Sequence, residues 1–427
     1  MERDSLVYRT YVEILRRELV CAMGCTEPIA IAYCAAVARA ALGALPERVT
    51  VESSGNIIKN VKSVVVPNTD GRRGIAAAAA IGILGGDENA ALEVISHVPE
   101  EAKAQLGDYL EKTEFRTLPA ESEYLLDITV RVEAGGHSAR VRAVQEHTNL
   151  VLVERDGEVL QSRPFPAESS TAEDDAPDYS LLTVEDICDF AASCALDDVR
   201  ELLARQIALN SAIADEGLRG DWGANIGKVL LTRGDDTRTR AKARAAAGSD
   251  ARMNGCELPV VINSGSGNQG LTASLPVIEY ARALGASEEQ LLRALLVSNL
   301  VTLHEKTGIG RLSAYCGAVS AGAGAGAGIA WLHGGGFEEV AHTIVNALAI
   351  TSGIVCDGAK SSCAGKIAMA VDAGILGFEM YRAGQQFYGG DGLVRKGVEN
   401  TIENFGRLGR VGMRETDKEI IRMMTGC

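Results

Sequence analysis

The sequence is poor in aromatic residues, in basic residues and in long apolar stretches. Phenylalanine, tryptophan and tyrosine together make up only 4% of the 427 residues, whereas glycine alone occurs 47 times. A core with so few rings relies on small side chains and on close approach between backbones. The composition therefore excludes an aromatic-rich core and predicts tightly packed elements.

Basic residues are outnumbered, since 42 lysines and arginines face 57 aspartates and glutamates, and the formal net charge is −15. This balance argues against a nucleic-acid groove or a polybasic membrane patch. The longest uncharged run, residues 312–332, is mostly glycine and alanine, and the charged N-terminal stretch lacks the apolar segment of a signal peptide. We therefore expect a cytoplasmic protein that acts on a small molecule, with no nucleic-acid or membrane partner, and whose cysteines stay reduced.

The pattern of apolar residues predicts an α+β fold. Helical spacing predicts two helices across residues 5–43 and an almost wholly helical chain from residue 183 onward. Between them, β-branched alternation predicts strands, "NIIKNVKSVVVPN" included, around an alanine-rich helix at 74–84. The acidic segment 165–180 is the predicted linker. We expect a mostly helical catalytic domain, with an α+β lobe inserted between its N-terminal helices and its C-terminal half: 1–46 and 171–427 for the catalytic domain, and 47–170 for the lobe and linker.

Three cysteines, Cys316, Cys356 and Cys363, begin or precede small-residue helices. A thiolate at a helix N-terminus has a lowered pKa and is a better ligand. Three such thiolates suit an iron–sulfur cluster with one open iron, or a zinc site, whereas packing as small buried side chains is the alternative. Cys25, at another turn into a helix, suits a reactive thiolate, a fourth ligand or a buried turn residue. We expect five further cysteines in the core: Cys21, Cys34, Cys188, Cys194 and Cys256.

The segment "NSGSGNQG", residues 263–270, joins a strand-like run to a helix. Backbone N–H groups of such a loop suit a carboxylate or phosphate, and a polar turn that caps the helix is the alternative. The Gly-Lys-Ser/Thr ending of a P-loop is missing. Lys59 and Asn60 suit a small anion site or a solvent-facing strand. His304 suits acid–base chemistry or a structural hydrogen bond.

Five segments, spread over nearly the whole chain, together resemble the L-cysteine desulfidases, which are relatives of the iron–sulfur L-serine dehydratases. They are "GCTEPIAIAYCAA", "KNVKSVVVPN", "INSGSGNQG", "KTGIGRLSAYCGAVSAGAGAGAG" and "GIVCDGAKSSCAGK". The resemblance implies an oxygen-sensitive [4Fe–4S] cluster. It also implies an elimination from L-cysteine that needs no pyridoxal phosphate and gives hydrogen sulfide, ammonia and pyruvate.

The resemblance also implies roles for individual residues. Cys316, Cys356 and Cys363 match the cluster ligands, and Cys25 matches an additional functional cysteine, which we expect to be the base or a cap on the open iron. The loop and the "KNVKS" segment are expected to bind the amino-acid substrate, through Asn263, Ser264, Ser266, Gly267, Asn268, Gln269, Lys59 and Asn60. Some related serine dehydratases cover their cluster with a C-terminal cysteine, and Cys427 stands at that place, with a frayed tail as the alternative.

Two other functions remain open at this point. One is the same chemistry on L-serine, and the other is a non-enzymatic protein that binds an iron–sulfur cluster or zinc. A homodimer is a further expectation.

Overall fold

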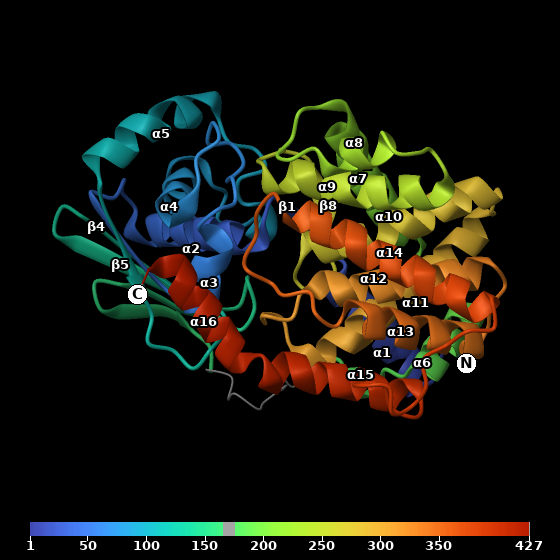
Figure 1. Ribbon diagram of the computed structural model, residues 1–427. Helices are drawn as coiled ribbons and strands as arrows, with labels where there is room; N and C mark the ends of the chain where they lie inside the picture. Colours follow the sequence, from blue (N-terminus) through green and yellow to red (C-terminus); the bar gives the residue numbers. More distant parts are fainter. Residues whose placement is uncertain (165–175, 427) are drawn as a thin grey trace.

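The computed structural model describes residues 1–164 and 176–426. Most of the predicted linker, and Cys427, therefore lie outside the described residues. Figure 1 shows two parts side by side: one built on a sheet and one built of packed helices. Helices predominate, which confirms the predicted α+β class. None of the helices in the described part of the chain combines the length and the apolar character that a membrane crossing requires.

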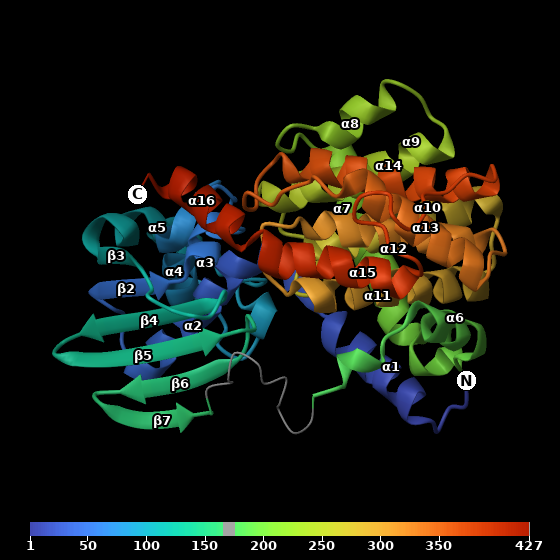
Figure 2. The ribbon, with the colours of Figure 1, turned by 60° about the horizontal axis from the view of Figure 1, so that its bottom comes forward.

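The first part is a six-stranded sheet with helices against it (Figure 2). The strand order is β3-β2-β4-β5-β6-β7, and only the β2–β3 pair is parallel. In β4, Ile128, Val130 and Val132 are buried while Arg131 is exposed, so one face of the sheet is apolar and needs a cover. The strands are β2 (Arg48–Ser53), β3 (Glu114–Pro119), β4 (Asp127–Ala134), β5 (His137–Val144), β6 (Leu150–Arg155) and β7 (Glu158–Ser162).

Helix α2 (Thr26–Leu42) supplies that cover, since it contacts β4, β5 and β6. A Cβ atom on Gly82 would lie 2.2 Å from the carbonyl oxygen of Ala32, so α4 packs directly onto the backbone of α2. Three more elements complete this part: α3 (Gly55–Val61), α4 (Gly74–Gly85) and α5 (Glu100–Lys112). The predicted domain boundaries stay a prediction. The structure adds one observation, that α2 packs on the sheet.

The second part is a bundle of helices with α12 (Gly317–Leu332) at its centre, in contact with α10, α11, α13 and α14. A two-stranded antiparallel pair, β1 (Cys21–Met23) and β8 (Pro259–Val261), ties the start of the chain to it. The other helices are α1 (Leu6–Glu18), α6 (Val184–Ser193), α7 (Arg200–Arg219), α8 (Ile226–Leu231), α9 (Thr237–Met253), α10 (Gly267–Leu284), α11 (Glu288–Ile309), α13 (Phe337–Thr351), α14 (Cys363–Arg382), α15 (Val398–Arg407) and α16 (Arg414–Thr425).

Glycine lets α12 and α14 touch along their backbones. A Cβ atom on Gly322 would lie 2.4 Å from the carbonyl oxygen of Ala370, and one on Gly326 would lie 2.5 Å from that of Gly374. Each glycine in a helix costs about 1 kcal/mol relative to alanine, so this close packing offsets the cost. Because the residue numbers rise together, the two helices run parallel and their N-termini lie at the same end.

Two local predictions are wrong. The segment "NIIKNV" forms the helix α3 and not a strand, because burying Ile57, Lys59 and Val61 outweighs the β-branched preference. Cys21 lies in strand β1 and not on a helix. Helix α16, near the end of the chain, crosses back from the helical part and packs on α3, where a Cβ atom on Gly55 would lie 2.9 Å from Ile421.

Candidate functional site

The N-termini of three parallel helices meet beside the sheet-bearing part of the protein. Ser266 precedes α10, Cys316 precedes α12 and Cys363 begins α14. A Cβ atom on Gly317 would lie only 2.6 Å from the side chain of Gln269, so the starts of α10 and α12 are in contact. The positive ends of three helix dipoles therefore point toward one small region, which favours negatively charged groups there.

A short antiparallel bridge brings Cys316 and Cys356 together. The Cys356 N–H donates to the carbonyl oxygen of Ala314 over 2.6 Å, and the Cys316 N–H donates to that of Ile354 over 3.3 Å. The charges of Cys356 and Cys363 both act on Cys316, so the three predicted ligands lie near one another.

The predicted lowering of the thiol pKa values is wrong for two of these three cysteines. Burial and the neighbouring Cys356 raise the pKa of Cys316 to about 12, and burial also raises the pKa of Cys363. The cost of moving a thiolate out of water therefore exceeds the benefit of the helix dipole at these sites. A bound metal reverses this balance, because coordination deprotonates a thiol.

Within the described ranges, no three histidine, cysteine, aspartate or glutamate side chains are placed to hold a single metal ion. A [4Fe–4S] cluster attaches its cysteines to separate irons, so its ligands do not have to meet at one point. Three neighbouring thiols, two at helix N-termini and one in the loop before α14, are a donor set that fits such a cluster. Two lysines, Lys306 and Lys366, lie within electrostatic range of Cys316 and Cys356 and fit its negative charge.

Cys25 and Glu27 form a buried pair at the start of α2. The Cys25 thiol donates to Glu27 Oε2 over 3.0 Å, and Asn60 Nδ2 donates to Oε1 over 3.1 Å. Burial, followed by the charge of Glu27, raises the pKa of Cys25 well above its usual value. Burial alone would raise the pKa of Glu27 too, but His147, whose Nε2 lies 4.0 Å away, and the Cys25 thiol lower it to about 2. The resting pair is therefore a thiol beside a carboxylate.

Cys25 also reaches the predicted ligands. It packs with Val64 and Met253 in a small apolar cluster that Cys363 joins from α14. A Cβ atom on Gly358, in the loop between Cys356 and Cys363, would lie 2.3 Å from the carbonyl oxygen of Lys59. The cysteine loop, α2 and α3 therefore meet at one place.

The "NSGSGNQG" loop lies against the start of α2. Thr26 Oγ1 donates to the carbonyl oxygen of Gly265 over 2.9 Å, and Ser264 has a φ of 49°, in the left-handed region. Asn263 Nδ2 donates to Asn299 Oδ1 over 3.0 Å. The side-chain oxygens of Asn263 and Gln269 are buried without a partner among the described residues, which leaves two acceptors at the loop for an ammonium or hydroxyl group.

Lys59 and Asn60 are both buried on α3, and they bind different partners. Lys59 Nζ lies 2.5 Å from Asp417 Oδ1 of α16, and Asn56 Nδ2 donates to the other oxygen of Asp417 over 2.8 Å. Asn60 binds Glu27, as described above. In this arrangement the charge of Lys59 is already balanced by the C-terminal helix.

The sequence interpretation missed three charged residues at this site: Glu27, Arg252 and Asp417. Arg252, in α9, is 2% exposed and donates to Asn268 Oδ1 over 3.2 Å. The signal that could have found it is a lone arginine in "GSDARMNGC", a segment made of small or apolar residues apart from Asp250 and Asn254. Nothing in the sequence pattern points to Asp417, because its partner Lys59 lies 358 positions away.

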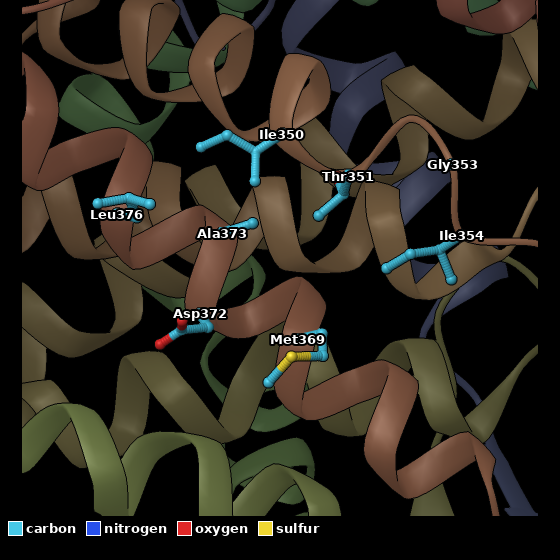
Figure 3. A pocket seen from close by; sticks show the side chains of 8 residues that line it. All are labelled: Ile350, Thr351, Gly353, Ile354, Met369, Asp372, Ala373 and Leu376. Carbon is cyan, nitrogen blue, oxygen red and sulfur yellow. The ribbon is translucent and has the colours of Figure 1, made fainter.

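Other candidates lie elsewhere. His304 Nε2 is 2.6 Å from Glu399 Oε2 of α15, and this hydrogen bond accounts for its placement. Cys34, Cys188, Cys194 and Cys256 are buried, as predicted. A surface pocket of about 350 Å³ between α13 and α14 (Figure 3) contains none of the predicted site residues; its lining is Ile350, Thr351, Gly353, Ile354, Met369, Asp372, Ala373 and Leu376.

Comparison with known proteins places the chain in a family. The sequence model described as "Serine dehydratase alpha chain" matches residues 89–422. A UPF0597 protein of Desulfitobacterium hafniense is 60% identical over 99% of this chain and 98% of its own length. Similar proteins from Lachnoclostridium phytofermentans and Treponema denticola are 51% and 45% identical, over 98% and 99% of this chain and 100% and 99% of their own lengths. The chain belongs to the serine dehydratase alpha chain family.

Proposed function

We propose that this protein is a lyase that needs no pyridoxal phosphate and that eliminates the β-thiol of L-cysteine, giving hydrogen sulfide, ammonia and pyruvate. The observation that carries the proposal is the meeting of three cysteines directly beside the "NSGSGNQG" loop: Cys316 and Cys363 at the starts of parallel helices, and Cys356 in the loop before α14. A ligand set and a polar loop in one place fit an enzyme better than a structural metal site, because a purely structural centre has no use for the loop.

The three cysteines would hold a [4Fe–4S] cluster. Such a cluster, with one iron free of protein ligands, supplies a Lewis acid that binds the β-substituent and favours its departure. The protein contributes the helix dipoles and two nearby lysines, Lys306 and Lys366, which stabilise the negative charge of thiolates. Burial lowers the pKa of Lys306 to about 8, so that it is still mainly protonated near neutral pH.

The loop would bind the amino-acid head group. Gln269 Oε1 and Asn263 Oδ1 are acceptors without a partner in the described structure, and they suit the substrate's ammonium group. Gln269 also contacts Gly317, one residue after Cys316, which would place a bound amino acid within reach of the cysteines.

Cys25 is our candidate for proton transfer at the substrate. Its Sγ lies beside Cys363 and holds a proton directed at Glu27. Removal of the α-proton and departure of the β-substituent leave an aminoacrylate, which reacts with water to give pyruvate and ammonia. A protonated thiol cannot accept a proton, so Cys25 acts on the substrate only as a thiolate; the Glu27 carboxylate, which accepts its hydrogen bond, is the group placed to take the thiol proton first.

L-Serine is the second candidate substrate, because the matching family is described as a serine dehydratase chain. The two substrates differ only in the leaving group, and a thiol is a softer ligand and an easier leaving group than a hydroxyl. The test is to supply anaerobically reconstituted protein with each amino acid and to measure pyruvate, with sulfide measured for L-cysteine. Sulfide and pyruvate in equal amounts from L-cysteine would support the first proposal, and pyruvate from L-serine alone would replace it with the second.

A further inference from the structure

Arg252 is a buried cation whose hydrogen bonds are mostly unmade. Arg252 is only 2% exposed. Among the described residues, its Nη1 atom alone has a hydrogen-bond partner, the Asn268 side chain. The Nε and Nη2 atoms are buried with no hydrogen-bond acceptor in the described part of the chain, and no described carboxylate forms an ion pair with Arg252. A guanidinium keeps its charge in proteins, so this is a buried charge with no described carboxylate at ion-pair distance.

Arg244, two turns earlier on the same helix, is the comparison: its Nε and Nη2 atoms are also buried without a hydrogen-bond acceptor among the described residues, but two carboxylates lie beside it. Its Nη1 donates to Asp215 over 2.7 Å, and its Nε lies 3.8 Å from Glu279. It is 8% exposed, so burial alone does not separate the two residues. Arg252 differs in lacking a carboxylate partner, and a buried charge without one is strongly destabilising.

The surroundings of Arg252 are those of the candidate site. The charges of Cys25, Glu27 and Cys363 act on it, so it lies within electrostatic range of all three. A Cβ atom on Gly267 would lie 2.3 Å from Arg252 Nε, so the first residue of α10 must be glycine to leave room for the guanidinium. Arg252 therefore lies directly under the loop that we propose for the amino-acid head group.

We propose that Arg252 binds the carboxylate of an α-amino acid through its Nε and Nη2 atoms. These two N–H groups lie in the guanidinium plane, point the same way from one edge of it, and match the two oxygens of a carboxylate. Asn268 accepts from Nη1, so it uses neither of these two donors. The inference rests on the proposed function for the identity of the amino acid, and it adds the group that recognises the carboxylate.

A different role for Arg252 would be to balance the charge of the cysteine thiolates and their cluster. That role needs only a positive charge and not the paired N–H donors of a planar guanidinium. Lysine keeps the charge and loses the paired geometry, so Arg252→Lys separates the two roles.

The test uses L-alanine as the probe, because it has the head group of the substrate but no β-substituent to eliminate. Its binding to the reconstituted protein is measured by calorimetry, with L-alaninamide as the probe without a carboxylate. We expect Arg252→Lys to weaken L-alanine binding about 10- to 100-fold, the usual effect of losing a hydrogen bond between charged groups. Arg244→Lys is the matched control on the same helix and should bind L-alanine like the wild type.

Iron content and the thermal unfolding midpoint are measured in the same samples. Weaker L-alanine binding in Arg252→Lys with full iron, and weak binding of L-alaninamide to the wild type, support the proposal. Equal binding of L-alanine and L-alaninamide, absence of L-alanine binding to the wild type, unchanged affinity in Arg252→Lys, or loss of iron from that variant would each overturn it. Turnover of L-cysteine and L-serine is assayed separately, so a carboxylate site without elimination would leave this inference standing and remove the proposed reaction.

Discussion

The Cys25 thiol donates a hydrogen bond to the Glu27 carboxylate over 3.0 Å, and both residues are buried at the start of α2. Glu27 accepts a second bond from Asn60 of α3, so the pair joins two elements of the sheet-bearing part of the protein. Cys25 itself packs beside Cys363 of the helical part. The proton on Cys25 Sγ therefore lies where the two parts meet, next to the proposed ligands.

Cys25→Ser is expected to keep full iron content and to lose exchange of the substrate's α-hydrogen with heavy water. Serine is nearly isosteric with cysteine, but its hydroxyl is far harder to deprotonate, so the geometry survives and the basicity does not. Iron is measured first and α-hydrogen exchange second. Full iron with wild-type exchange would rule out Cys25 as the base, and loss of iron would instead make Cys25 a ligand.

The Glu27 carboxylate should make stability depend on pH. Its pKa in the folded protein is about 2, below the usual 4.5, so its stabilising contribution is present above about pH 4.5 and is lost as the pH falls toward 2. A shift of this size corresponds to roughly 3 kcal/mol. Urea unfolding of wild type and Glu27→Gln at neutral pH and near pH 3 checks this, and an equal loss of stability in both proteins would contradict it.

Substituting any of the three proposed ligands should remove the cluster. Cys316→Ala, Cys356→Ala and Cys363→Ala are each expected to lose iron and turnover after anaerobic reconstitution, because each removes one thiolate. Cys188→Ala and Cys194→Ala are the controls, since both residues are buried in or beside α6 and should keep iron and activity. Full iron and turnover in any of the first three variants would show that residue not to be a ligand.

Loop substitutions should impair substrate binding without touching the cluster. Asn268→Ala removes the one hydrogen-bond partner that Arg252 has among the described residues, and Gln269→Ala removes a buried acceptor that has no partner there. We expect the KM for the amino acid to rise about tenfold or more, from the loss of a hydrogen bond to a charged group. Kinetics and the visible spectrum are recorded together. Unchanged kinetics in both variants would show that the loop only caps the helix.

The Lys59–Asp417 pair should hold α16 on the rest of the protein. Lys59 is 1% exposed, so Asp417→Ala leaves a buried lysine without a counter-charge, which costs about 3 kcal/mol or more. The matched control is Glu415→Ala, two residues away, which breaks a solvent-exposed pair with Lys418 and should cost far less. The free energy of unfolding in urea compares the two, and equal losses would count against a structural role of the buried pair.

Much of the local structure could be predicted from sequence because it depends on neighbouring residues. The alternation in β4 and β5, and the helix starts at Cys363 and directly after Cys316, are carried by spacing within a few residues. The segment "NIIKNV" was predicted wrongly because its β-branched residues fit a strand equally well, and its packing against α2, α4 and α16 favours a helix. The pattern of residues that are neighbours in the sequence carries no information about a contact with a distant helix.

The candidate site could be predicted in part for the same reason. Cys316, Cys356 and Cys363 stand out as residue types, whereas the raised pKa values of Cys316 and Cys363 depend on burial, which the helix-dipole argument leaves out. Arg252 and Asp417 are ordinary charged residues in the sequence and gain meaning only from being buried. Their partners lie on other elements, so only the folded structure singles them out.

The most direct test of the account is product formation by the anaerobically reconstituted protein with L-cysteine, and with L-serine in parallel. The account predicts equal amounts of sulfide and pyruvate from L-cysteine, and loss of both products when air destroys the cluster. A protein that holds a full complement of iron and releases pyruvate from neither amino acid would contradict it.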